Sequence, residues 1–307
     1  MQVVRNDKYI QMHKSVLLHE VIESLAPQAG GIFVDATFGG GGHSRQLASI
    51  IGEKGLLIAL DADEKVFSDA RVDEIRALTS FIPIVSNFRN IGEVLKEHEG
   101  QKIDGVLFDL GLSSNQLEES GRGFSFQRDE PLTMTFAHDP KGDDVTAESV
   151  VNQWSEESLA TIFRGFGEER FARSIAKHIV EARGVSPITT TKQLVEVIHQ
   201  STPSWYQRGR THFATRVFQA IRMAVNDELG AIESGINGML PYLRSGGRIA
   251  VISFHSIEDR LVKQMFRNLV LKGQVHAVTK KPIIPNAAEL EMNPRARSAK
   301  LRVLEKA

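Results

Sequence analysis

The stretch from residue 31 to residue 43, GIFVDATFGGGGH, constrains the fold of this chain more than any other. An apolar run ends at Asp35, four consecutive glycines follow, and a helix-like segment begins at His43. Glycines let backbone N–H groups come close to a ligand and adopt positive φ angles where a turn requires them. The pattern predicts a strand, a ligand-binding glycine loop and the first turn of a helix. An ordinary glycine-rich turn is the alternative.

A second apolar run, GLLIAL, ends at Asp61, about 20 residues beyond the glycine loop. In nucleotide-binding α/β folds, an acidic side chain at this position accepts hydrogen bonds from ribose hydroxyls. The dinucleotide fingerprint needs a third glycine at position 44, where this chain has Ser44. We therefore expect S-adenosylmethionine as the ligand, and a nicotinamide-dependent oxidoreductase is the less favoured alternative.

Strand and helix patterns alternate as far as residue 112. This order predicts a parallel sheet with helices on both faces and a ligand outside the carboxyl ends of its strands. Asp35, Asp61 and Asp109 each end an apolar run, so we predict that they share one cleft. Phe88 follows a further run, FIPIV, whose Pro83 favours the sheet edge. The ring of Phe88 either flanks an adenine or fills the core.

The alternation stops after residue 112, and three helix patterns without strands follow between residues 156 and 200. A long helical pattern then covers residues 214–243, before the strand pattern GGRIAVISF. We predict a discontinuous α/β domain of residues 1–112 and 213–307, interrupted by a mostly helical insertion of residues 113–212. The segments QVHAVT and AKLRVLEK near the C-terminus are expected to form a final pair of strands.

The composition limits the possible functions. The chain has no cysteine, which excludes disulfides and thiolate metal sites, and no apolar run of the ~20 residues that a membrane span requires. No histidines or carboxylates stand at metal-ligand spacing, so no metal site is predicted. The polar N-terminus and the lack of disulfides favour a cytoplasmic location.

Seven strings then follow one another along the chain: DATFGGGGH, DGVLFDLGLSS, RGFSF, FGEERFARSIAKHIVEAR, ATRVFQAIRMAVNDEL, ISFHSIEDRLVK and NPRARSAKLRV. Together they resemble the RsmH (MraW) family of ribosomal RNA methyltransferases over residues 13–305. The combination is far more specific than a glycine loop alone. The resemblance implies an α/β fold of the class I S-adenosylmethionine-dependent methyltransferases. This fold is Rossmann-like, with a mostly parallel seven-stranded sheet and a helical insertion after the fourth strand.

The resemblance also implies a reaction and its residues. The family methylates the exocyclic N4 of a cytidine, cytosine 1402, in the decoding region of 16S ribosomal RNA in the small ribosomal subunit. Its cofactor contacts map onto Gly41, Gly42, His43, Asp61, Phe88, Asp109 and Gln116. We add Asp35 to the predicted cofactor site because of its place at a strand end. Asp109 is the first candidate for the catalytic acceptor of the amino proton, and His255 is the second.

Basic residues gather toward the C-terminus, although the net charge of the chain is −1. Residues 256–307 hold 11 Lys and Arg against 5 Asp and Glu. A basic stretch suits phosphate binding, and a solvated surface is the alternative. The side chains that we predict to contact RNA are Arg208, Arg210, Arg216, Arg222, Arg295, Arg297 and Lys300.

The chain departs from the family pattern at several positions. Asn115 and Phe213 each replace a proline, Thr133 and Thr135 replace an aspartate and an arginine, and Phe136 replaces a methionine. We expect the lost charges to lie near the mouth of the active site or on the surface that faces RNA. These departures keep open an alternative function, that of a catalytically weakened RNA-binding or ribosome assembly factor.

Overall fold

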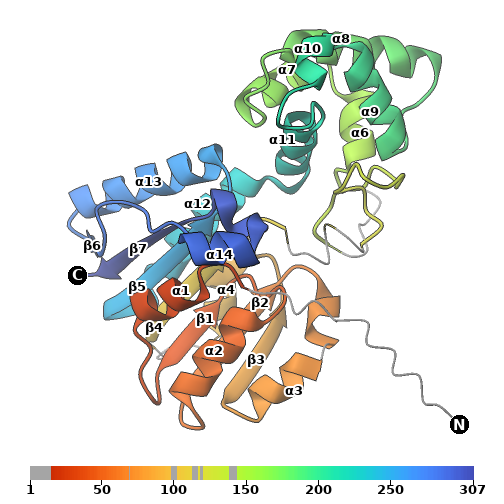
Figure 1. Cartoon of the computed structure of the whole chain (residues 1–307). Coiled ribbons are helices and arrows are strands. Elements are labelled where there is room, and N and C mark those ends of the chain that lie inside the picture. Colours follow the sequence, from red (N-terminus) through yellow and green to blue (C-terminus); the bar gives the residue numbers. More distant parts are fainter. Residues whose placement is uncertain (1–14, 69, 98–101, 113–116, 118–119, 138–143) are drawn as a thin grey trace, which may run out of the picture.

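The computed structural model describes residues 15–68, 70–97, 102–112, 117, 120–137 and 144–307. An α/β domain built on one sheet and a helical unit that projects from it make up the molecule (Figure 1). None of the helices in these ranges is long and apolar enough to cross a membrane.

The sheet has seven strands in the order β3-β2-β1-β4-β5-β7-β6. The first five strands along the chain are parallel, and β7 is antiparallel to both of its neighbours. The strands are β1 (Ile32–Asp35), β2 (Leu56–Asp61), β3 (Ser80–Val85), β4 (Ile103–Asp109), β5 (Leu243–Ser253), β6 (Val275–Ala277) and β7 (Lys300–Lys306). The predicted mostly parallel sheet is confirmed, as are the edge position of the Pro83 strand and the final pair of strands.

Helices cover both faces of the sheet. Successive strand residues point to opposite faces, so Phe33 packs with α1 and α2 while Val34 packs with α4, α12 and α13. The helices of this domain are α1 (Leu18–Leu25), α2 (Gly42–Ile51), α3 (Ala70–Arg76), α4 (Ile91–Lys96), α12 (Glu228–Met239), α13 (Ser256–Leu271) and α14 (Ala287–Met292). Short 3₁₀ turns are η1 (Glu64–Ser68), η2 (Phe88–Asn90) and η3 (Pro294–Ser298).

The inserted helices have a hydrophobic core of their own. They are α6 (Ala147–Gln153), α7 (Glu156–Gly165), α8 (Ala172–Val185), α9 (Thr191–Gln200), α10 (Ser204–Gln207) and α11 (Thr215–Asn226). This core includes Val217 and Ile221 of α11, which lies beyond the predicted boundary at residue 212. The expected helical pattern of residues 214–243 breaks at Asp227, whose φ angle is +45°.

Candidate active site

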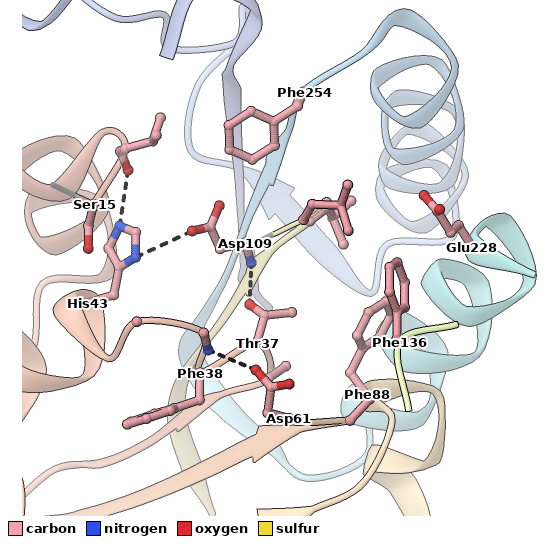
Figure 2. Close-up of a pocket in the computed structure, with 18 of the residues that line it drawn as sticks. Ser15, Thr37, Phe38, His43, Asp61, Phe88, Asp109, Phe136, Glu228 and Phe254 are labelled. Atoms are coloured by element: carbon pink, nitrogen blue, oxygen red, sulfur yellow. Dashed lines mark hydrogen bonds and ion pairs between the residues drawn. The ribbon is translucent and has the colours of Figure 1, made fainter. Parts of the chain in front are cut away.

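A cleft opens at the carboxyl ends of the parallel strands, and residues of the insertion close one side of it (Figure 2). The structure brings six of the predicted cofactor residues together there: Gly41, Gly42, His43, Asp61, Phe88 and Asp109. We call the side formed by the strand ends and the glycine loop, with Gly39, Asp61 and Asp109, the cofactor wall. The opposite side, with Phe136, Asn226 and Glu228, is called the insertion wall.

The glycine loop is shaped to bring backbone close to a ligand. Gly41 has a φ angle of +69° and precedes the first turn of α2. A Cβ atom on Gly41 would lie 2.9 Å from the ring of Phe38, so a side chain here meets both strain and a clash. Because α2 begins at Gly42, the N–H groups of its first turn have no acceptor within the helix. Gly41, Gly42 and His43 all line the cleft, so the start of α2 lies at the ligand site.

Asp61 connects the loop to the end of β2. Its Oδ2 accepts a hydrogen bond from the N–H of Gly39 at 2.8 Å, and its Oδ1 accepts one from the N–H of Asp63 at 2.9 Å. Burial is the main cause that raises the pKa of Asp61, and these backbone bonds oppose it. Each carboxylate oxygen has a second lone pair, so Asp61 can also accept hydrogen bonds from ribose hydroxyls. Phe88 lines the same cleft and packs edge to face on Phe108, at 5.8 Å between ring centroids.

Asp35 lies beneath the cleft and does not line it. Its carboxylate accepts hydrogen bonds from the Ser44 hydroxyl at 2.7 Å and from the N–H of Thr37 at 3.2 Å. The residue is only 1% exposed, and burial raises the pKa of Asp35 to about 6. Ser44, which departs from the dinucleotide fingerprint, therefore anchors the helix after the glycine loop to the end of β1.

Asp109 ends β4 and lines the cleft. Its N–H donates to the Thr37 hydroxyl at 2.7 Å, and its Oδ2 lies 3.7 Å from Nδ1 of His43 (Figure 2). Its Oδ1 is buried and has no hydrogen-bond partner among the described residues. Burial, followed by the charges of Asp35 and Glu258, raises the pKa of Asp109 well above its usual value. Asp109 thus holds one unsatisfied acceptor at the centre of the cofactor wall.

His43 links Asp109 to the segment before α1. Its Nε2 lies 3.1 Å from the carbonyl oxygen of Val16, and the side chain is 5% exposed. Because a carbonyl only accepts, Nε2 carries the hydrogen of this bond, and Nδ1 faces Asp109. His43 therefore lies between the segment before α1 and the carboxylate of Asp109, and it also lines the cleft.

Two carboxylates of the cleft were missed by the sequence-based prediction. Glu228 begins α12 and Glu258 lies in the first turn of α13. Burial raises the pKa of Glu228, whereas bonds and charge from His255 and Arg222 outweigh the burial of Glu258 and lower its pKa. The strings NDEL and SIED carried these residues, but only as part of the family pattern.

Arg222 and His255 have structural partners. Arg222 is 14% exposed and donates to both carboxylate oxygens of Glu228, at 2.7 and 2.9 Å, so the structure does not support its predicted contact with an RNA phosphate. His255 is the N-cap of α13 and accepts from the N–H of Glu258. It lies beside the cleft but is not among the residues that line it.

Glu228, His255 and Glu258 together have the ligand types of a metal site. Their ligand atoms lie within 4.8 Å of one another. The guanidinium of Arg222 already compensates the charge of Glu228, and His255 lies 3.1 Å from Oε1 of Glu258. The two carboxylates of this group thus already have partners within the protein.

Phe136 stands on the insertion wall because buried polar groups hold the backbone around it. Arg122 donates to the carbonyl oxygen of Phe136 at 2.8 Å and pairs with Asp63 at 2.8 Å, with both side chains 8% exposed. The side chain of Asn226 accepts from the N–H of Phe136 at 2.9 Å and donates to the carbonyl oxygen of Met134 at 2.8 Å. The insertion wall is thus tied to the turn after β2 and to the end of α11.

The departures from the family pattern lie in this same segment. Thr135 is buried, and its hydroxyl donates to the carbonyl oxygen of Ala137 at 3.1 Å. Neither Thr133 nor Thr135 lines the cleft among the described residues, although the adjacent Phe136 does. Asn115 and the predicted cofactor residue Gln116 lie outside the described residues.

The other basic side chains that were predicted to contact RNA differ in their exposure and in their ion pairs. Arg208, Arg210 and Arg297 are exposed, and Arg295 is exposed at the cleft. Arg216 is half-buried and donates to the carbonyl oxygen of Glu168 at 3.2 Å. Lys300 pairs with Asp259 at 2.9 Å, which compensates its charge.

The fold and the cleft define the class of protein. A seven-stranded sheet with β7 antiparallel, a glycine loop after β1 and an acidic residue at the end of β2 form a class I methyltransferase that uses S-adenosylmethionine. Asp61 offers a hydrogen-bond acceptor in this cleft, Gly41 allows close approach of the backbone, and Phe88 adds an aromatic ring to the lining. The nicotinamide alternative is thereby set aside.

The chain belongs to the MraW methylase family, whose model matches residues 10–307. It is 44% identical over 315 residues to the ribosomal RNA small subunit methyltransferase H of Paenibacillus sp. (strain JDR-2), covering 96% of this chain and 99% of that one. The protein of the same name from Clostridioides difficile (strain 630) is also 44% identical, with 96% and 98% covered. Among solved structures, an rRNA methylase from Streptococcus thermophilus aligns with a TM-score of 0.43 at 14% identity, over 96% of this chain and 98% of that one.

Proposed function

We propose that this protein transfers the methyl group of S-adenosylmethionine to small-subunit ribosomal RNA, at the exocyclic N4 of a cytidine. The ribosomal RNA substrate is supported by the names of relatives that match this chain over nearly its whole length. Cytosine 1402 of the decoding region is the target that we propose on the same family resemblance.

The observation that carries the choice of an amino group is the unsatisfied Oδ1 of Asp109. The lone pair of cytosine N4 is delocalised into the ring, so the amino group is a weak nucleophile. An acceptor that bonds its N–H localises this lone pair and receives the proton as the new N–C bond forms. The raised pKa of Asp109 makes its carboxylate a stronger proton acceptor than an ordinary aspartate.

The other residues of the cleft are expected to align the target base with the methyl group. Methyl transfer from a sulfonium requires the nucleophile in line with the methyl group, and such alignment contributes roughly 7–11 kcal/mol in favourable intramolecular cases. Phe136 on the insertion wall lines the same cleft, and we assign its ring to contact with the target base. The base must be unpaired or rotated out of a helix to reach this position.

The test is methylation of small ribosomal subunits purified from cells that lack this activity, with isotopically labelled S-adenosylmethionine. Mass mapping of the RNA is expected to find one labelled methyl group on N4 of a cytidine. Subunits from cells that have the activity are the matched control and should accept no label. Label on another atom would overturn the choice of N4. Bound RNA without any transfer would favour the weakened assembly factor instead.

A further inference from the structure

Three aromatic rings surround one arginine in the insertion. The guanidinium carbon of Arg170 lies 4.8 Å from the ring centroid of Trp205, 5.1 Å from that of Tyr206 and 5.6 Å from that of Phe171. The rings meet edge to face, with centroids 4.9, 5.8 and 6.1 Å apart. We call Arg170, Phe171, Trp205 and Tyr206 the arginine–aromatic cluster.

A buried carboxylate holds one side of the cluster in place, and the other side is exposed to solvent. The hydroxyl of Tyr206 donates to Glu169, which is 2% exposed and also accepts from the N–H of Phe171 at 2.8 Å. Trp205 nevertheless remains 59% exposed. A large ring kept in one orientation while most of its surface meets water is suited to a contact that forms on binding.

The surroundings of the cluster are positively charged. Arg208 and Arg210 follow Trp205 within five residues, and both are exposed, as is Arg170. In the part of the chain that the structure describes, none of these three arginines forms an ion pair with a carboxylate. A protein surface of this kind attracts phosphate, and its charge complements a nucleic acid backbone.

The segment that carries Arg170 contacts a helix that contributes to the cleft. Glu168, two residues before Arg170, accepts hydrogen bonds from Ser256 at 3.0 Å and from Arg260 at 2.7 Å, both on α13. The same helix contributes Glu258 to the cleft. The short helix α10, which carries Trp205 and Tyr206, lies beside α7 and α8 in the insertion (Figure 1). An RNA strand whose target base enters the cleft can extend along the insertion to this surface.

We propose that the arginine–aromatic cluster is a stacking platform for an unpaired base that flanks the target nucleotide. The base stacks on Trp205, and Arg170, Arg208 and Arg210 bind the neighbouring phosphates. Aromatic rings beside arginines bind single-stranded nucleic acid in this way, because every base has a π-face. The inference rests on the proposed function, since it takes RNA as the substrate.

Fluorescence tests the platform directly. The chain has two tryptophans, so Trp154→Phe leaves Trp205 as the sole reporter. Titration of this variant with an unstructured single-stranded oligoribonucleotide is expected to quench the emission of Trp205, and a duplex of the same sequence should quench it less. An emission that stays constant while filter binding shows RNA bound would overturn the proposal, and so would equal quenching by the duplex.

Steady-state kinetics of Trp205 variants provide a second test of the platform. Trp205→Ala should raise KM for small ribosomal subunits by roughly 5- to 150-fold and leave both kcat and affinity for S-adenosylmethionine unchanged. Trp205→Phe should retain most of the affinity, and Val185→Ala, at an apolar side chain 92% exposed in the same insertion, is the matched control. A KM for Trp205→Ala equal to that of the control would contradict the platform. Failure of the wild type to methylate these subunits would count against the proposed function, whereas the fluorescence arm tests the platform separately.

Discussion

The two walls of the cleft are stabilised by different kinds of contact. On the cofactor wall, Asp61 is held by the backbone N–H of Gly39, and Asp35 beneath this wall is held by the hydroxyl of Ser44, so the contacts are local in sequence. On the insertion wall, Phe136 depends on Asn226, 90 residues away, and on the buried pair of Arg122 with Asp63. Substitutions on the cofactor wall should therefore change cofactor binding and chemistry. Substitutions that loosen the insertion wall should first change stability.

The largest effect is expected at the centre of the cofactor wall. Asp109→Asn removes the proton acceptor but keeps the shape of the side chain, so kcat should fall by about 10²–10⁴. Affinity for S-adenosylmethionine should change little, as measured by equilibrium binding. Asp73→Asn, at a side chain 83% exposed, is the control and should keep the wild-type rate. An unchanged kcat in Asp109→Asn would remove Asp109 from the chemistry.

Substitutions that loosen the insertion wall are expected to lower the free energy of unfolding. Arg122→Met leaves Asp63 buried without its partner, which is expected to lower the free energy of unfolding by roughly 3–5 kcal/mol. Arg76→Met breaks an exposed pair with Asp73 and should cost at most about 1 kcal/mol. Denaturant unfolding of the two variants compares them directly. Equal losses would show that the Arg122 pair does not hold this wall.

Asp35 should make stability depend on pH. Its folded-state pKa is raised from 3.8 to about 6, so the folded protein keeps a proton that the unfolded chain releases between these values. The free energy of unfolding of the wild type should therefore fall as pH rises from about 4 to about 6, by up to about 3 kcal/mol from this group. Asp35→Asn should lack this part of the slope, and identical slopes in denaturant unfolding would argue against the raised pKa.

Substitution of Asp61 is expected to weaken the binding of S-adenosylmethionine. Asp61→Ala removes the predicted ribose acceptor and the support of the glycine loop, and hydrogen bonds to charged groups contribute roughly 1.5–3 kcal/mol. The Kd for S-adenosylmethionine, measured by calorimetry, should rise by about 10- to 150-fold. Asp73→Asn again serves as the exposed control. Wild-type affinity in Asp61→Ala would place the cofactor elsewhere.

The smallest effect is expected where the two domains touch at the surface. Glu168→Gln weakens the pair with Arg260, in which the side chains are 47% and 68% exposed. Exposed pairs contribute at most about 1 kcal/mol, so unfolding should change little. Glu181→Gln, from the exposed pair with Lys177, is a matched control. A loss several times larger than in this control would reveal a tighter joint between the domains.

The cofactor wall could be predicted from sequence because its signals are local. The apolar runs, the terminal aspartates and the four glycines follow one another within short segments, and parallel strands bring their carboxyl ends to one edge. Support by Ser44 was not predicted, since the sequence showed only that position 44 lacks a glycine.

The insertion wall could not be predicted in the same way. The periodicity of α11 indicates an apolar face but not which core covers it, and in the structure this face packs in the core of the insertion. Arg222 looked like other surface arginines until the turn at Asp227 brought Glu228 beside it. The contacts of Arg122 and Asn226 with the Phe136 segment join residues far apart in sequence, for which no local pattern exists.

The pH dependence of single-turnover methyl transfer, measured with saturating S-adenosylmethionine and RNA, tests the role of Asp109 most directly. The carboxylate must be ionised to accept a proton, so the wild-type rate should rise with pH along a limb whose midpoint lies above the ordinary range of an aspartate. Asp109→Asn should be slow and should lack this limb. The same limb at the wild-type rate in both proteins would contradict the account.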